Sequence, residues 1–154
     1  MILIHACCAP CVSPILDEVH DYHVFWYNPN IHPYREYLRR LETLKKLKEE
    51  KHFTLIVDPE YPLQNWLEIA IKLNKKSDVL RCRFCYADRL ERTARYAKEN
   101  GYEYFTTSLL YSPYQKHELV KEIGESIAKK YGLYRQGYCG CIFSEFDRYY
   151  REDR

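Results

Sequence analysis

The sequence predicts an α/β protein built on a mostly parallel sheet flanked by helices. Apolar residues alternate along the chain between a strand-like and a helix-like period. The 154 residues are 46% hydrophobic and 30% charged, a composition typical of a globular domain with one core. Because no repeat, low-complexity tract or linker interrupts the chain, we expect a single domain over residues 1–154.

Four strands are predicted, most of them short apolar runs closed by residues that favour turns. The first covers residues 1–6, and the second, residues 22–27, runs into the Asn-Pro-Asn-Ile-His-Pro segment. Proline and asparagine rarely continue a strand, so this segment indicates a loop. The third strand, residues 53–57, is closed by Asp58 and Pro59, and the fourth covers residues 104–107.

Helices are predicted between the strands. A short one over residues 13–19 is expected to open at Ser13 and Pro14, since proline is favoured in the first helical turn. Residues 34–51 carry a stripe of leucines at positions 38, 41, 44 and 47. The remaining helices are expected at residues 66–73, from Cys82 to a C-cap at Asn100 and Gly101, at residues 118–131, and from Ser144 onwards.

The polar loops of this arrangement lie at one edge of the sheet. The loops over residues 7–11, 28–33, 58–62 and 108–115 all follow strands. In a parallel sheet the carboxyl ends of the strands meet at the same edge, where open α/β folds bind their ligands. We therefore expect the functional site at this edge, with the cysteine-rich first loop at its centre.

Charge and hydropathy indicate the cellular compartment of the protein and the classes of partner that it can bind. The net charge is only +2, so no overall field attracts a polyanion. Arginines cluster in residues 81–95, and the 16 tyrosines fit either a tyrosine-rich core and rim or an RNA-stacking surface. No apolar run is long enough to span a membrane, and the N-terminus lacks the basic region of a signal peptide. We expect a cytoplasmic protein with no membrane partner.

Seven cysteines in a reducing compartment favour metal or redox chemistry over a disulfide framework. Cys7, Cys8 and Cys11 fall within five residues, and Cys82 and Cys85 have a spacing that serves zinc, an iron–sulfur cluster or a redox dithiol. Together they supply the four thiolates that a four-iron cluster usually needs. Zinc is the alternative, but no cysteine–histidine pair has zinc-finger spacing, so iron–sulfur is favoured.

The last cysteine pair, Cys139 and Cys141, is separated by one glycine. A disulfide across so small a ring is expected to be strained and easily reduced, which suits two-electron transfer. Ligation of a metal by both sulfurs is the alternative.

Nucleotide cofactors are not supported by any motif. A nucleotide-binding α/β protein needs a glycine-rich phosphate loop after its first strand, and the loop over residues 7–11 contains no glycine. His32 and His117 are weaker candidates for acids, ligands or phosphate contacts. Polar residues that line the pocket, or else cap backbone groups, are Tyr27, Asn28, Asn30, Tyr111, Tyr114 and Gln115.

Five segments spread over nearly the whole chain form a specific combination. They are Cys7-Cys-Ala-Pro-Cys11, Tyr27-Asn-Pro-Asn-Ile-His-Pro33 with Glu36-Tyr37, Arg81-Cys-x-x-Cys-Tyr86 with Arg89-Leu90, Ser112-Pro-Tyr-Gln115, and Tyr138-Cys-Gly-Cys141. This combination resembles the cobalamin-independent epoxyqueuosine reductases of the queuosine tRNA pathway. The resemblance implies a HUP-like (Rossmann-like) domain in which cysteines replace the phosphate loop.

The resemblance also implies a reaction and a set of site residues. An iron–sulfur-dependent reductase would convert the epoxide of epoxyqueuosine in tRNA to the alkene of queuosine with loss of water, the last step of the pathway, using a low-potential electron donor. The resemblance places a 4Fe–4S cluster on Cys7, Cys8, Cys82 and Cys85, and a redox-active pair on Cys139 and Cys141. It also implies a second metal site, or else pocket-lining residues, at Cys11, Asp88, Asn28 and His32. The residues it implies for substrate binding are Tyr27, Arg89, Tyr114 and Gln115.

Two other classes of function remain open from the sequence. One is a zinc-binding RNA-binding protein without catalysis, and the other is a tRNA sulfur-transfer enzyme. The second normally activates its substrate with ATP, and the missing phosphate loop argues against it. For the reductase, Asp88, His32 or a tyrosine is expected to protonate the leaving oxygen. The arginines of residues 81–95 and exposed tyrosines are expected to hold the tRNA.

Overall fold

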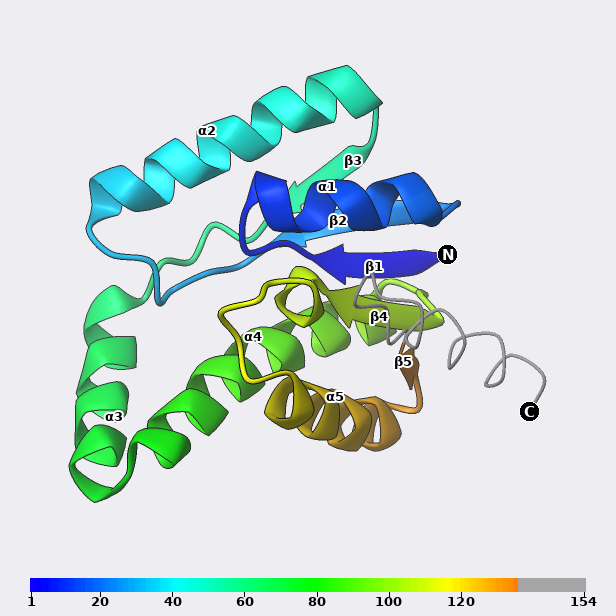
Figure 1. The fold of residues 1–154 in the computed structure, drawn as a ribbon. Helices are drawn as coiled ribbons and strands as arrows, with labels where there is room; N and C mark the ends of the chain where they lie inside the picture. Colours follow the sequence, from blue (N-terminus) through cyan, green and yellow to red (C-terminus); the bar gives the residue numbers. More distant parts are fainter. Residues whose placement is uncertain (136–154) are drawn as a thin grey trace.

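The structure, a computed structural model, describes residues 1–135 and contains one parallel sheet in that part of the chain (Figure 1). The strand order is β3-β2-β1-β4-β5, and every neighbouring pair is parallel. This confirms the predicted α/β class with a mostly parallel sheet. The strands are β1 (Ile2–His5), β2 (Tyr22–Trp26), β3 (Thr54–Val57), β4 (Tyr104–Thr107) and β5 (Tyr134–Arg135).

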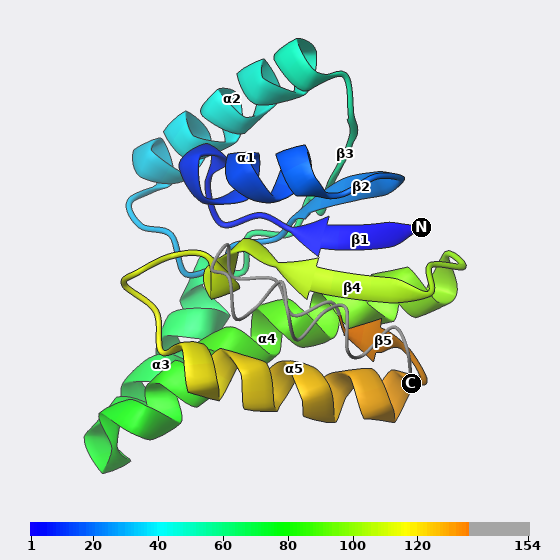
Figure 2. The same ribbon diagram turned by 45° about the vertical axis from the view of Figure 1, so that its right-hand side comes forward.

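Helices cover both faces of the sheet. Helices α1 and α2 lie on one face and α4 and α5 on the other, as two views of the ribbon show (Figures 1 and 2). The helices are α1 (Ala9–Glu18), α2 (Tyr34–Lys51), α3 (Leu63–Lys76), α4 (Asp78–Glu99) and α5 (His117–Tyr131), with a short 3₁₀ turn, η1 (Ser108–Leu110), after β4. Helix α3 packs mainly on α4, away from the sheet.

The two layers are built from alternate residues of the same strands. In β1, Ile2 and Ile4 belong to the core beneath α1 and α2, whereas Leu3 belongs to the core beneath α4 and α5. Successive side chains of a strand point to opposite faces, so a strand buried on both sides reads as a continuous apolar run. Strand β1 is therefore central, and the cysteine-rich segment that follows it lies at the middle of the carboxyl edge, as predicted.

The predicted start of the first helix is wrong. Helix α1 begins at Ala9, and Pro10 occupies its first turn while Pro14 lies inside it. Proline fits either position near a helix start, because the first amides of a helix have no intrahelical acceptor. Cys8 is consequently the N-cap residue and Cys11 is helical, so residues 7–11 are not a continuous loop.

The predicted helix start at the second cysteine pair is also wrong. Helix α4 begins at Asp78, and the Ser77 side chain accepts a hydrogen bond from the Val79 amide, as an N-cap does. Cys82 and Cys85 therefore lie in the second turn of the helix rather than at its N-terminus, and the helix dipole acts on them less than expected.

Smaller differences concern the periphery. Helix α3 is longer at both ends than residues 66–73, and the short strand β5 was not expected from the sequence. In α2 the buried stripe is Tyr37, Leu41 and Leu44, while Leu38 is 41% exposed. The predicted helix from Ser144 lies outside the described residues. Among residues 1–135, no helix has the length and apolar character needed to cross a membrane.

Candidate metal centre

Three sulfur atoms meet where β1 leads into α1. The Sγ atoms of Cys7, Cys8 and Cys11 all lie within 4.8 Å of one another, and those of Cys7 and Cys8 are 4.0 Å apart. Cys7 is buried, and the other two are partly buried against the same core. Three thiols this close form a ready set of ligands for a thiophilic metal.

The backbone fixes this geometry. Cys8 caps α1, and its carbonyl accepts the first helical hydrogen bond from the Val12 amide at 3.3 Å. The Cys7 amide donates to Ser108 Oγ at 2.9 Å, and the Ser108 hydroxyl lies 3.1 Å from Cys7 Sγ. Ser108 begins the η1 turn after β4, so the loops after two adjacent strands together hold Cys7 in place.

The three thiols shift one another's pKa values in different directions. Contact with Cys11 raises the pKa of the Cys7 thiol, and contact with Cys7 raises the pKa of the Cys8 thiol. The hydrogen bond from Cys7 lowers the pKa of Cys11. A bound cation favours thiolates and displaces thiol protons, so it would counteract the hydrogen bonding and burial that raise the pKa values of Cys7 and Cys8. The donor set therefore fits an iron or zinc centre.

The second cysteine pair lies on the neighbouring helix. Cys82 packs against the core that contains Cys7, and Cys85 is held by Arg89, whose Nε donates to the Cys85 carbonyl at 3.0 Å and whose Nη2 donates to Cys85 Sγ at 3.1 Å. Burial raises the pKa of Cys85 although Arg89 opposes the shift. Neither sulfur joins the group of three within 4.8 Å.

A polar network links α4 to the ends of β2 and β3. The Tyr27 hydroxyl donates to Asp88 Oδ2 at 3.3 Å, and burial raises the pKa of the Asp88 carboxyl. The Arg92 guanidinium lies 4.4 Å from the Tyr27 ring centroid and donates to Asp58 and Glu60, each at 3.0 Å. The predicted site loop over residues 58–62 therefore contacts α4 through Arg92.

The other predicted site residues differ in burial and in their hydrogen-bond partners. Asn28 is buried, and its Nδ2 donates to the Ala6 carbonyl at 2.9 Å, which leaves its Oδ1 without a hydrogen-bond partner. Gln115 accepts from the Tyr86 hydroxyl at 2.8 Å. Tyr114 is 91% exposed, and His32 is exposed in the loop before α2. Cys139 and Cys141 lie outside the described residues.

Sequence reasoning missed two residues that support the site, His5 and Ser108. His5 is fully buried at the end of β1, where Nδ1 lies 2.9 Å from Thr107 Oγ1 and Nε2 lies 2.9 Å from the Tyr27 carbonyl. It thereby joins the carboxyl ends of three adjacent strands. A histidine closing an apolar strand directly before the cysteines was the only available signal, and nothing in the sequence marked the serine.

Comparison with known proteins identifies the family. A family model described as epoxyqueuosine reductase QueH matches residues 2–133. The chain belongs to the epoxyqueuosine reductase QueH family. This confirms the family that the five cysteine-containing and loop segments resemble.

Individual members of the QueH family match over most of their length. The epoxyqueuosine reductase QueH of Dehalococcoides mccartyi is 39% identical over 96% of this chain and 94% of its own. The Thermotoga maritima QueH is 34% identical over 96% and 91%, and that of Acinetobacter baylyi 34% identical over 93% and 79%. The residues of the sulfur centre lie within the range that the QueH family model matches, which ends at residue 133.

The buried histidine of this QueH family member predicts an acid-sensitive fold. Burial lowers the pKa of His5 to about 3 from 6.5, so between these values the unfolded chain binds a proton that the folded chain excludes. The free energy of unfolding is therefore expected to fall as the pH drops below 6.5, by up to about 1.4 kcal/mol per pH unit from this residue alone.

Urea unfolding of the reduced, chelated protein between pH 4.5 and 7.5 measures this slope. His5→Gln removes the titrating group, so its free energy of unfolding should decline less steeply below pH 6 than that of the unmodified chain, whatever its absolute stability. Equal slopes for the two proteins would show that His5 does not carry the acid sensitivity.

Proposed function

We propose that this chain is an epoxyqueuosine reductase, which reduces the epoxide of epoxyqueuosine in tRNA to the alkene of queuosine in the last step of queuosine biosynthesis. The observation that carries the proposal is the cluster of Cys7, Cys8 and Cys11 at the centre of the carboxyl edge, in a member of a family with this name. The reaction consumes two electrons and two protons and releases water. The proposed setting is the cytoplasm, with a low-potential electron donor.

For the metal centre, we propose a 4Fe–4S cluster on Cys7, Cys8, Cys82 and Cys85, with Cys11 contributing to an additional iron. The proposal is supported by the close approach of the first two sulfurs and by the packing of Cys82 on the core that contains Cys7. When bound, such a cluster supplies single electrons at a potential that its hydrogen bonds and burial adjust. The Arg89 guanidinium would stabilise the thiolate of Cys85.

For the proton, we propose Asp88 as the donor to the epoxide oxygen. Its carboxyl is partly buried, its pKa lies above the usual range, and Tyr27 donates to one of its oxygens. A carboxylic acid that stays protonated closer to neutral pH is a better general acid. Its position on α4, one turn after Cys85, places it on the helix that carries two of the proposed ligands.

For electron delivery, we propose that Cys139 and Cys141 cycle between dithiol and disulfide. Arg135, the last described residue, pairs with Phe105 of β4, which in turn pairs with Leu3 of β1. Two strand spacings therefore separate Arg135 from Leu3, which is about 10 Å, and Cys7 lies four residues beyond Leu3, which is ~13 Å along the strand. The two components combine to a distance of about 16 Å between Arg135 and Cys7. Six extended residues span about 20 Å, so the chain length allows Cys141 to reach the centre.

The activity is tested by an anaerobic assay of the reconstituted protein. The substrate is tRNA that contains epoxyqueuosine, the reductant is a low-potential dye, and nucleosides are analysed by mass spectrometry. A product lighter by one oxygen supports the reductase. Absence of turnover from protein with a spectroscopically intact cluster would contradict it, and a colourless protein with stoichiometric zinc would favour a zinc-dependent RNA-binding protein.

A further inference from the structure

Three tyrosine rings, here called the stack, contact one another at the loops that follow β2 and β3. The rings of Tyr34 and Tyr37 lie 5.8 Å apart between centroids with an interplanar angle of 14°. Tyr61 lies 4.3 Å from Tyr37 at 29° and 5.5 Å from Tyr34 at a tilted 34°. Each ring therefore contacts the other two, and an exposed ring held in such a group can accept a further flat ring.

The stack is anchored on one side and open on the other. Tyr37 is 6% exposed and meets the buried Trp26 edge-on, with ring centroids 5.5 Å apart. The Tyr61 hydroxyl donates to the Ile31 carbonyl, which ties the loop after β3 to the loop after β2. Tyr34 is 55% exposed. Since more than half of Tyr34 is exposed although its ring contacts both Tyr37 and Tyr61, we infer that part of the ring is available to a ligand.

The stack and the proposed catalytic residues lie at the same edge of the sheet but belong to the core layers on its two faces, with Trp26 and Tyr37 in one layer and Tyr27 in the other. Trp26, on which the stack rests, directly precedes Tyr27, whose hydroxyl donates to Asp88. Tyr61 directly follows Glu60, which binds the Arg92 guanidinium that covers the Tyr27 ring. The stack and the site therefore share the loops of the carboxyl edge.

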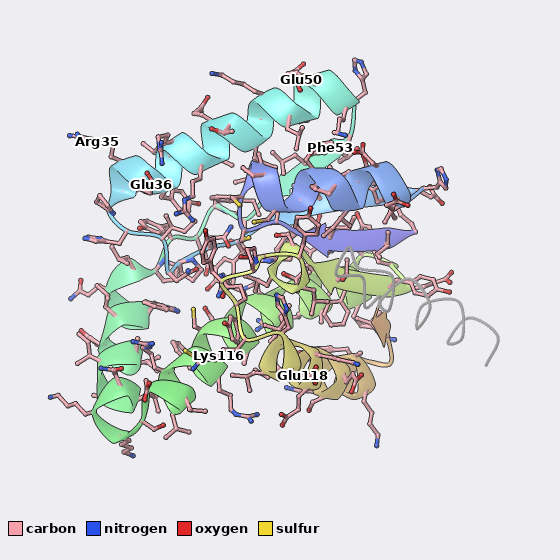
Figure 3. The ribbon with its side chains drawn as sticks, in the orientation of Figure 1. Arg35, Glu36, Glu50, Phe53, Lys116 and Glu118 are labelled. Atoms are coloured by element: carbon pink, nitrogen blue, oxygen red, sulfur yellow. The ribbon has the colours of Figure 1, made fainter. Side chains whose placement is uncertain are left out.

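The first two turns of α2, which begin at the open ring, carry an excess of positive charge. Arg39 and Arg40 both bind Glu36, and their side chains remain 74% and 44% exposed. Arg35 is exposed next to Tyr34 in the chain, and its side chain extends away from the N-terminal end of α2 (Figure 3). Three arginines against one glutamate leave an excess of positive charge, which suits the phosphates on either side of a stacked base.

We propose that the Tyr34 ring receives the unpaired base next to the modified nucleoside of the RNA substrate. The inference rests on the proposed function, which requires that nucleoside to leave its own stack to reach the site. A base that leaves a loop exposes one face of its neighbour, and proteins that bind unpaired RNA cover such faces with aromatic side chains. Tyr34 supplies that ring at the edge of the site.

The test is a binding measurement with the metal-loaded protein and the RNA hairpin that carries the modified nucleoside. Tyr34→Leu is expected to weaken binding about 5- to 150-fold, the range for loss of one base–aromatic stack. Tyr34→Phe, which keeps the ring, should bind like the unmodified protein. Leu38→Ala, which shortens another exposed apolar side chain of α2, is the matched control and should leave binding unchanged.

RNAs that lack a single base show which neighbour of the modified nucleoside stacks on Tyr34. When one neighbour of the modified nucleoside lacks its base, Tyr34→Leu should have no further effect on the dissociation constant. An equal effect of Tyr34→Leu on every RNA, or no effect on any, would overturn the inference. So would unchanged RNA binding with a raised KM for a protein electron donor, which would place a protein on this surface.

The same measurements separate this inference from the proposed activity. RNA binding that depends on Tyr34, with no epoxide reduction by the intact metal-loaded protein, would support the stacking surface and contradict the reductase. Reduction that proceeds with the same KM for RNA after Tyr34→Leu would support the reductase and overturn the stacking surface.

Discussion

Replacement of Cys8 with alanine is expected to abolish metal binding and epoxide reduction together. Its sulfur lies 4.0 Å from that of Cys7, and both belong to the group of three within 4.8 Å. Removal of one thiolate leaves too few ligands to hold a cluster against solvent and reductant. Iron and acid-labile sulfide should fall to background, visible absorbance should disappear, and turnover should drop below detection.

Ser13→Ala is the matched control, because it removes a small polar group from the same helix two residues beyond Cys11. It should retain iron, sulfide and turnover. A Cys8→Ala protein with full cluster absorbance would rule out the proposed ligand set. Cys11→Ala and Cys82→Ala then separate the roles, since loss of one iron with four retained in Cys11→Ala would support an additional iron at that cysteine.

Replacement of Arg89 with methionine is expected to lower metal affinity and turnover by about 10- to 100-fold, the usual cost of removing a group that orients a ligand. Arg89 is only 4% exposed, and its guanidinium donates to both the carbonyl and the sulfur of Cys85. Without this positive charge, burial and the neighbouring Cys82 and Asp88 act unopposed on the Cys85 thiol, so its pKa rises further and deprotonation for metal binding becomes harder.

Arg95→Met on the exposed surface of the same helix makes the same chemical change away from the cysteines. It should bind iron like the unmodified protein, and its turnover at saturating tRNA should be unchanged. Competition with a chelator gives relative metal affinity, and steady-state assays at matched iron content give turnover. If Arg89→Met and Arg95→Met behave alike in both measurements, Arg89 does not act through Cys85.

Hydrophobic patterning predicted much of the architecture. A strand that is buried on both faces is a short apolar run in the sequence, and it can be recognised without knowing which strands lie beside it. The alternation of such strands with helices predicted the parallel sheet and the edge that carries the loops. Helix starts were less certain, because Pro10 and Pro14 each fit a first turn and the cap at Ser77 resembles an ordinary loop serine.

The sequence by itself determined that a group of thiols lies at the end of a central strand, because grouped cysteines are visible as spacing. Only the tertiary structure decided which residues support them. Ser108 meets Cys7 across 101 positions and His5 meets Thr107 across 102. Likewise Tyr34 and Tyr37 meet Tyr61 only because the loops after β2 and β3 converge. Such contacts depend on which strands are adjacent and in what register, and local sequence carries no signal for either.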